Sequence, residues 1–173
     1  MQLQIPFDIE TAKRLNAGDH LLLSGRLLTA RDAAHKRLCD LLDKGEELPV
    51  DIKNQVIYFV GPTPARPGRV IGAAGPTTSS RMDKYSPKLI AAGLRAMIGK
   101  GYRGKEVVEA LQKYNAIHFS AIGGLGAILS KCIKSAKILA YEDLGTEAIR
   151  ELIVEDFPVI VAYDCRGNSI YES

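Results

Sequence analysis

The sequence has little cysteine and few aromatic residues: its 173 residues include three cysteines, seven tyrosines, four phenylalanines and no tryptophan. Cys39, Cys132 and Cys165 are odd in number and far apart, which excludes a disulfide framework and a closely spaced thiolate metal site. No apolar run approaches the roughly 18 residues that a membrane-spanning helix needs. The first ten residues also lack the basic leader and apolar stretch of a secretory signal. We therefore expect a protein of the reducing cytoplasm, with no membrane partner and no metal site of its own.

Apolar residues make up 46% of the chain and charged residues 25%, the balance of a folded globular protein. There is no internal repeat, low-complexity tract or evident linker, so we predict a single domain over residues 1–173.

Positive charge is concentrated in one segment. Between Gly61 and Lys105 there are nine basic residues and one acidic residue, a net charge of +8 in a chain whose total is +3. A segment of one sign attracts anions, whether phosphate, nucleic acid or a carboxylate substrate. The alternative is a solvated basic face without a ligand.

Short apolar runs alternate with segments of helical spacing. Strands are predicted at His20–Leu28, Gln55–Val60, Arg95–Ile98, Ile117–Ile122, Ala136–Ala140 and Phe157–Ala162, and helices at Arg31–Asp43, Thr78–Ala92, Gly104–Tyr114 and Ala127–Ile133. Interleaved strands and helices indicate an α/β fold with a sheet that is at least partly parallel. The Pro/Gly-rich stretch at residues 61–69 is interpreted as a surface loop.

Residues 75–83, Gly-Pro-Thr-Thr-Ser-Ser-Arg-Met-Asp, are the most informative segment. Consecutive hydroxyl residues are unfavourable inside a helix and favourable where one begins, so we predict a helix start here. Its unpaired N–H groups and Arg81, four residues after Thr77, form a receptor for a carboxylate or another anion. The alternative is an ordinary capped helix with a surface arginine.

Arg31, Asp32 and His35 form a second candidate cluster at the start of the helix predicted over residues 31–43. Helical spacing places Arg31 and His35 on one face. Asp32, three residues before His35, is expected to orient the imidazole or raise its pKa. An arginine that holds a carboxylate beside a titratable histidine suits an active site. The alternative is a structural aspartate with an exposed histidine.

Three further features are less specific. Lys100 lies between two glycines after a predicted strand, a place where α/β folds bind ligands. The sequence Gly-Gly-Leu-Gly at 123–126 matches half of a dinucleotide fingerprint, although a tight strand-to-helix turn is the simpler interpretation. His118 is interpreted as a core histidine with satisfied hydrogen bonds, and the cysteines as small buried apolar side chains.

Several motifs, in one order along most of the chain, resemble the β subunit, or equivalent C-terminal domain, of iron–sulfur-dependent class I fumarases and tartrate dehydratases. They are TARDAAHKRL (Thr29–Leu38), YFVGPTPARPGRVIGAAGPTTSSRMD (Tyr58–Asp83), IGKG (Ile98–Gly101), YEDLGTEAI (Tyr141–Ile149) and VEDFPVIVAYDCRGN (Val154–Asn168). The GPTPARPG and EDLG…VEDFP segments are more similar to fumarase than to tartrate dehydratase.

The resemblance implies reversible hydration of fumarate to (S)-malate. It implies a swivelling β/β/α domain with a mixed sheet and flanking helices, in a hetero-oligomer that is active only with a partner α subunit. That partner, and not this chain, holds the [4Fe-4S] cluster through three cysteines. By motif position, Arg31, Arg81 and Lys100 bind the carboxylates of a small dicarboxylate substrate. Thr77 occupies the position of a proposed catalytic base, and His35 that of a proposed active-site histidine.

Other functions stay open at this point. An L-tartrate dehydratase β subunit is the alternative within the family. A nucleic-acid-binding module is the alternative from another class, although the basic segment carries only two aromatic residues, Tyr85 and Tyr102. A phosphate- or nucleotide-binding enzyme is the third, but the chain lacks the P-loop spacing of glycine and lysine. We expect a dicarboxylate ligand and no nucleic acid.

Overall fold

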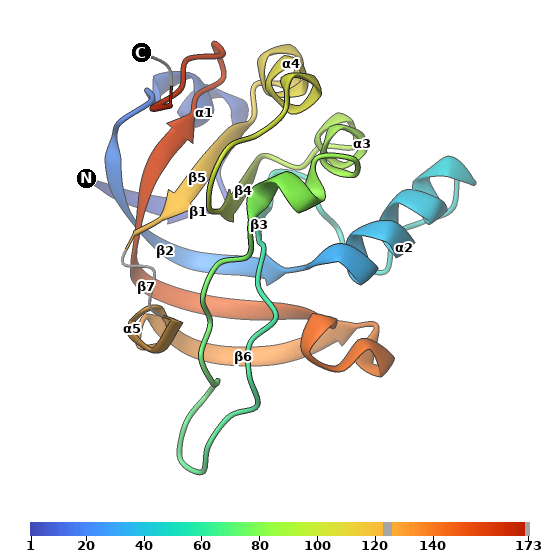
Figure 1. Cartoon of the computed structure of the whole chain (residues 1–173), viewed down its shortest axis with the longest axis vertical. Coiled ribbons are helices and arrows are strands. Elements are labelled where there is room, and N and C mark those ends of the chain that lie inside the picture. Colours follow the sequence, from blue (N-terminus) through green and yellow to red (C-terminus); the bar gives the residue numbers. More distant parts are fainter. Residues whose placement is uncertain (123–125, 172–173) are drawn as a thin grey trace.

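The computed structural model describes residues 1–122 and 126–171, in which strands and helices alternate (Figure 1). The strands are β1 (Gln2–Ile5), β2 (His20–Thr29), β3 (Val56–Tyr58), β4 (Ala96–Gly99), β5 (Ile117–Ala121), β6 (Ile133–Ala140) and β7 (Ile149–Tyr163). The helices are α1 (Ile9–Arg14), α2 (Asp32–Asp43), α3 (Ser86–Ala91), α4 (Lys105–Tyr114) and α5 (Gly126–Ser130), with 3₁₀ helices η1 (Ser79–Met82) and η2 (Glu142–Glu147). Within this part of the chain, no helix has the length and apolarity needed to cross a membrane.

The strands form one mixed sheet that closes on itself. Neighbouring strands from β1 to β5 are parallel, in sequence order. The 15-residue strand β7 then runs antiparallel to β5 on one edge and to β2 on the other, and β6 pairs with the first half of β7. The predicted α/β class, with a mixed sheet and flanking helices, is therefore confirmed.

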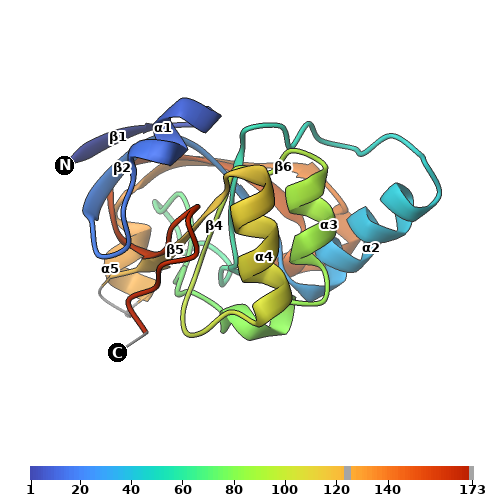
Figure 2. The same ribbon diagram turned by 90° about the horizontal axis from the view of Figure 1, so that it is seen from above.

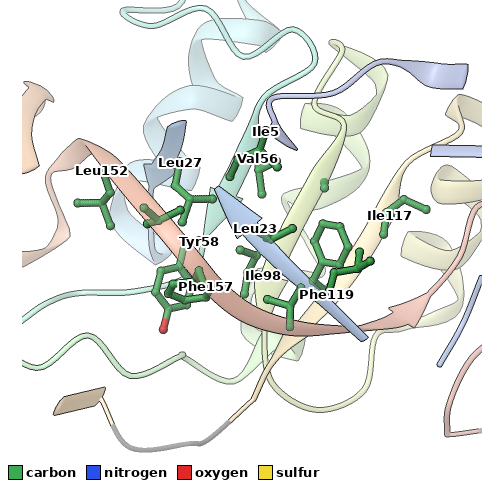
Figure 3. Close-up of a cluster of buried hydrophobic side chains, with 14 of the residues drawn as sticks. Ile5, Leu23, Leu27, Val56, Tyr58, Ile98, Ile117, Phe119, Leu152 and Phe157 are labelled. Carbon is green, nitrogen blue, oxygen red and sulfur yellow. The ribbon is translucent and has the colours of Figure 1, made fainter. Parts of the chain in front are cut away.

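The two faces of the sheet bury two separate apolar cores. Val56 and Tyr58 of β3 point into the closed sheet, where they meet Leu23 and Phe157 (Figure 3). Their neighbours in the sequence, such as Phe59, point outward to the layer of α2, α3 and α4, which lie along one side (Figure 2). This alternation follows from the two-residue period of a strand. Burial on both faces makes the short parallel strands continuously apolar.

The helix predicted at Thr78–Ala92 is wrong as a single element. Thr78 is not helical, η1 is one 3₁₀ turn of four residues, and α3 begins separately at Ser86 with Pro87 in its first turn. So short a turn does not build the helix dipole that the prediction required. Attraction for anions at this place must come from side chains.

Other differences concern the ends of the chain and the long strand. β1 and α1 were not predicted, and the strand predicted at Phe157–Ala162 is the last part of β7. Its first half carries exposed charged residues such as Glu155 and Asp156, which hide the strand pattern. The helix predicted at Ala127–Ile133 ends at Ser130, and Ile133 begins β6. Residues 123–125 of the predicted glycine turn lie outside the described residues.

The segment from Gly61 to Pro76 is a loop that leaves the sheet and returns to the same place (Figure 1). Its tip, residues 63–70, is exposed, which confirms the predicted surface loop. At its base the Thr77 N–H donates to the Phe59 carbonyl at 2.7 Å, and the Tyr58 hydroxyl donates to the Ala74 carbonyl at 2.5 Å. The return of the loop therefore places Thr77 beside the end of β3.

Candidate active site

The predicted site residues follow the carboxyl ends of three adjacent parallel strands. Arg31 comes two residues after β2, Thr77 is hydrogen-bonded to the residue that follows β3, and Lys100 directly follows β4. The carboxyl ends of parallel strands meet at one edge of a sheet, and α/β folds with open and with closed sheets both bind ligands there. The topology thus brings together residues that are as much as 69 positions apart in the sequence.

Arg31 and Arg81 converge on one carboxylate. Arg81 donates from Nη2 to Asp32 Oδ1 at 2.8 Å and from Nε to Oδ2 at 3.2 Å, while Arg31 Nε lies 3.9 Å from Asp32 Oδ1. Arg31 Nε is buried and has no hydrogen-bond acceptor among the described residues. The fork of Arg81 is the geometry that grips a carboxylate at two points. Together the arginines form a cationic pair around a carboxylate.

Gly61 makes room for Arg31. A Cβ at this position would lie 2.8 Å from Arg31 Nη1 and 3.0 Å from its Cδ. The absence of a side chain after β3 therefore lets the arginine lie across the end of the strand. The Pro/Gly-rich sequence predicts a loop here but not its contact with Arg31, because local turn chemistry does not reveal a distant neighbour.

Thr77 precedes the short turn that carries Arg81, and the main chain of Lys100 lies beside the start of that turn. The Ser79 N–H donates to the Lys100 carbonyl at 2.8 Å, and Thr78 forms a parallel bridge with Lys100. Within residues 1–122 and 126–171, neither the Thr77 hydroxyl nor the Lys100 ammonium has a side-chain hydrogen bond or ion pair. Lys100 is exposed and Thr77 is partly exposed, so a ligand can reach both groups.

His35 lies in the core and does not face this surface. Its ring is fully buried between Phe59 and Tyr85. Its Nδ1 lies 2.8 Å from the Arg31 carbonyl; a carbonyl only accepts, so Nδ1 carries the proton. The expectation that Asp32 orients this ring is wrong, because Asp32 binds Arg81 instead. His35 fixes the main chain at Arg31.

Asp32 does act to raise the pKa of His35, as expected, but burial outweighs it and, with the charge of Arg103, lowers that pKa from 6.5 to about 4. Between about pH 6.5 and pH 4 the unfolded chain protonates His35 and the folded chain does not. The free energy of unfolding therefore falls as the pH drops through this range. We expect a loss of about 1.4 kcal/mol per pH unit for such a histidine. The pKa of buried His118 is lowered too and adds in the same direction.

Urea unfolding at about pH 7 and about pH 5 measures this loss, since carboxylates titrate mostly below that range. The variant His35→Gln should show a smaller difference between the two conditions. Equal stability of the wild-type chain at both would contradict the assignment of two neutral buried histidines.

A buried polar network supports the turn from below. His118 is hydrogen-bonded to Ser79 and Arg103, and Arg103 also binds Asp83 and Ser86. The interpretation of His118 as a satisfied core histidine is therefore confirmed. Arg103 could not be singled out from the sequence, because nothing local distinguishes it from the other basic residues of its segment.

A model of the fumarase C-terminus family matches residues 1–173. The chain belongs to this family. This fumarase C-terminus chain is 39% identical over 156 residues to fumarate hydratase 2 of Leishmania major and 40% identical over 154 residues to the aerobic class I fumarate hydratase of Escherichia coli K12. It is 37% identical over 166 residues to a putative L(+)-tartrate dehydratase subunit beta of Methanocaldococcus jannaschii.

The shares covered differ between these relatives. The matches to the two fumarate hydratases cover 89% and 88% of this chain but only 28% of each relative. The match to the tartrate dehydratase subunit covers 92% of this chain and 85% of the relative. The chain therefore spans less than a third of the fumarate hydratases and most of the separate subunit. The resemblance noted from the motifs is confirmed.

The cysteines of this fumarase C-terminus chain do not suit an iron–sulfur cluster. Cys39 lies in the core beneath the helices and Cys165 in the core inside the sheet, while Cys132 is near Asp156. Burial raises the pKa of the Cys39 thiol to about 11, which disfavours the thiolate that binds metal. Among the described residues, no three histidine, cysteine or acidic side chains gather as metal ligands.

Proposed function

We propose that this chain is the β subunit of an iron–sulfur hydro-lyase that adds water reversibly to fumarate, giving (S)-malate. The observation that carries the proposal is the convergence of Arg31 and Arg81 on the carboxylate of Asp32. A site that already holds one carboxylate between two guanidinium groups suits a substrate that carries two. The fumarate hydratase and tartrate dehydratase relatives support the reaction class.

In this proposal the [4Fe-4S] cluster belongs to a partner α subunit, since the described cysteines of this chain do not suit it. Such a cluster supplies Lewis-acid assistance to the making and breaking of the carbon–oxygen bond. The match to a separate β subunit supports a two-chain assembly. This chain then contributes substrate binding and charge stabilisation.

Each site residue has a role that follows from its place. Arg81 and Arg31 hold one carboxylate of the substrate, and Lys100 approaches the other. When hydroxyl adds to one alkene carbon, negative charge develops on the neighbouring carbon and its carboxylate, and these cations stabilise it. That carbon then takes up a proton to complete the hydration.

Thr77 is the group of this chain placed to guide that proton. A threonine hydroxyl is a weak base and needs neighbouring positive charge to act as one; in this proposal Arg81, four residues later, and Lys100, whose main chain pairs with Thr78, supply it. We assign to His35 the holding of Arg31, because its ring is buried and bonded to the Arg31 carbonyl.

Anaerobic reconstitution with a cluster-bearing α subunit tests the proposal. We expect fumarate hydration with both chains together and none with either chain alone. The loss of fumarate absorbance measures the reaction. Hydration of fumarate by this chain in the absence of iron would contradict it. So would an inactive but fully assembled, cluster-loaded complex.

An L-tartrate dehydratase β subunit is the second candidate, favoured by the relative whose length this chain nearly matches. One or two pocket contacts separate these substrates. The reconstituted enzyme should therefore be offered fumarate and L-tartrate side by side. A higher kcat/KM for L-tartrate would replace fumarate as the substrate and leave the site assignments unchanged.

The nucleic-acid alternative is weakened because several basic residues of the segment from Gly61 to Lys105 are bound to other groups of the protein. Arg95 and Arg103, two of its nine basic residues, are buried and bind neighbouring protein groups. Lys88 is paired with Asp43, and Arg81 is assigned here to the dicarboxylate site. Part of the positive charge of this segment therefore has a structural role or is neutralised by a neighbouring aspartate.

A further inference from the structure

Arg103 is a charged residue whose side chain is completely buried. Its Nε donates to Asp83 Oδ1 at 2.8 Å and its Nη2 to Ser86 Oγ at 2.6 Å. Its Nη1 lies 3.1 Å from His118 Nδ1, and the guanidinium packs over the Phe59 ring. A buried arginine is costly unless its donors are satisfied. Because this side chain is closed off from solvent, any effect on a ligand must pass through its neighbours.

The contact with Arg103 fixes the tautomer of His118. A guanidinium only donates hydrogen bonds, so Nδ1 must accept and is unprotonated. Burial and the charge of Arg103 lower the pKa of His118 and keep the ring neutral. Its proton is then on Nε2, which lies 3.1 Å from Ser79 Oγ and donates to it.

Ser79 is the first residue of η1, the turn that carries Arg81. Its hydroxyl is tightly enclosed: a Cβ on Gly99 would lie 2.2 Å from it. At the other end of the turn, Asp83 accepts from Arg103 Nε and from the Gly104 N–H at 2.8 Å. Arg103 thus holds both ends of η1, directly through Asp83 and indirectly through His118 and Ser79.

We propose that Arg103 and His118 are positioning residues of the anion site, which set η1 with its Arg81, and Thr77 just before it, through a series of hydrogen bonds of fixed direction from Arg103 to His118 to Ser79. This role rests on the proposed function for its effect on catalysis, but not for its geometry. A network that merely satisfies buried polar groups would stabilise the fold without influencing turnover.

The direction of these hydrogen bonds is tested by nitrogen NMR of labelled histidine rings. The sample is the full polypeptide without a partner subunit. There are three histidines, His20, His35 and His118, and the two buried ones should be neutral in opposite tautomers. His118 should carry its proton on Nε2 and His35 on Nδ1. Ser79→Ala should leave the His118 tautomer unchanged and shift its Nε2–H signal. A charged His118, or one protonated on Nδ1, overturns the proposal.

The effect on catalysis is tested with Ser79→Ala in the assembled enzyme. The long side chain of Arg81 tolerates a small shift of the turn, whereas the short Thr77 does not. We therefore expect kcat to fall about tenfold or more, with a smaller change in KM.

Asp164→Asn is the matched control, because this buried aspartate accepts from Ala17, Arg166 and Asn168 and does not contact the turn. It should lower Tm and leave kcat unchanged. Equal kcat in wild type and Ser79→Ala overturns the positioning role. An inactive wild-type assembly would instead contradict the proposed function. The NMR result would still show whether the hydrogen bonds run from Arg103 to His118 to Ser79.

Discussion

Replacing Arg81 with alanine should lower kcat/KM of the assembled enzyme by about 10²-fold or more, because a charge-assisted contact at two points is lost. Arg81 is the side chain that already grips a carboxylate by this geometry, at 2.8 and 3.2 Å. The guanidinium is half-exposed, so its removal leaves no buried charge and should affect folding little. Steady-state kinetics with the dicarboxylate, together with Tm, separate the two effects.

Arg37→Ala is the matched control for this variant. Arg37 lies on the same helix as Asp32 and also makes a two-point ion pair, with Asp143 at 3.0 and 2.6 Å. It is outside the proposed site, so its removal should leave kcat/KM near the wild-type value. If Arg81→Ala retains near-normal turnover, or if both variants lose activity equally, Arg81 is not a substrate ligand.

Arg81→Lys distinguishes charge from shape. Lysine keeps the positive charge but lacks the planar fork that binds both carboxylate oxygens. Activity between that of the wild type and Arg81→Ala is expected. Full recovery with lysine would mean that the site needs only a positive charge here, and the two-point grip on Asp32 would then be no guide to substrate binding.

The parallel strands and the residues at their ends could be predicted from the sequence. β3 and β4 are buried along their whole length and β5 over its first three residues, so each contributes a short apolar run, whereas β2 is longer and ends in the buried residues Leu27–Thr29. Lys100 directly follows β4 and Arg31 comes two residues after β2, and the hydroxyl-rich turn before Arg81 is unusual enough to be noticed. Local pattern is sufficient where a site is built at strand ends.

Partners that are distant in the sequence could not be predicted. Asp32 was assigned to His35, its neighbour on the helix, but it binds Arg81, which is 49 residues away. Nothing local indicates that the return of a long loop places η1 beside α2. The same limit applies to β7, whose pairing with both β2 and β5 closes the sheet. Its charged first half resembles a surface segment when taken alone.

Replacing Arg103 with methionine should cause the largest loss of stability. Methionine fills much of the same volume, but Asp83, Ser86 and His118 each lose a hydrogen-bond donor. Breaking a buried charge pair from one side costs about 3–5 kcal/mol in free energy of unfolding. In a domain of this size each kcal/mol lowers Tm by about 2–4 °C. Urea unfolding and calorimetry measure the change.

Lys88→Met is the control, since Lys88 also pairs with an aspartate, Asp43, but at an exposed position. It should change stability little, because water replaces the lost partner. The double variant Arg103→Met, Asp83→Asn then separates a lost network from a poor fit of methionine. If Arg103 acts through Asp83, the second substitution should cost much less in the Arg103→Met background than in the wild type. Additive losses would instead mean that Asp83 holds the turn through the Gly104 N–H alone, and that Arg103 stabilises only the core around Phe59.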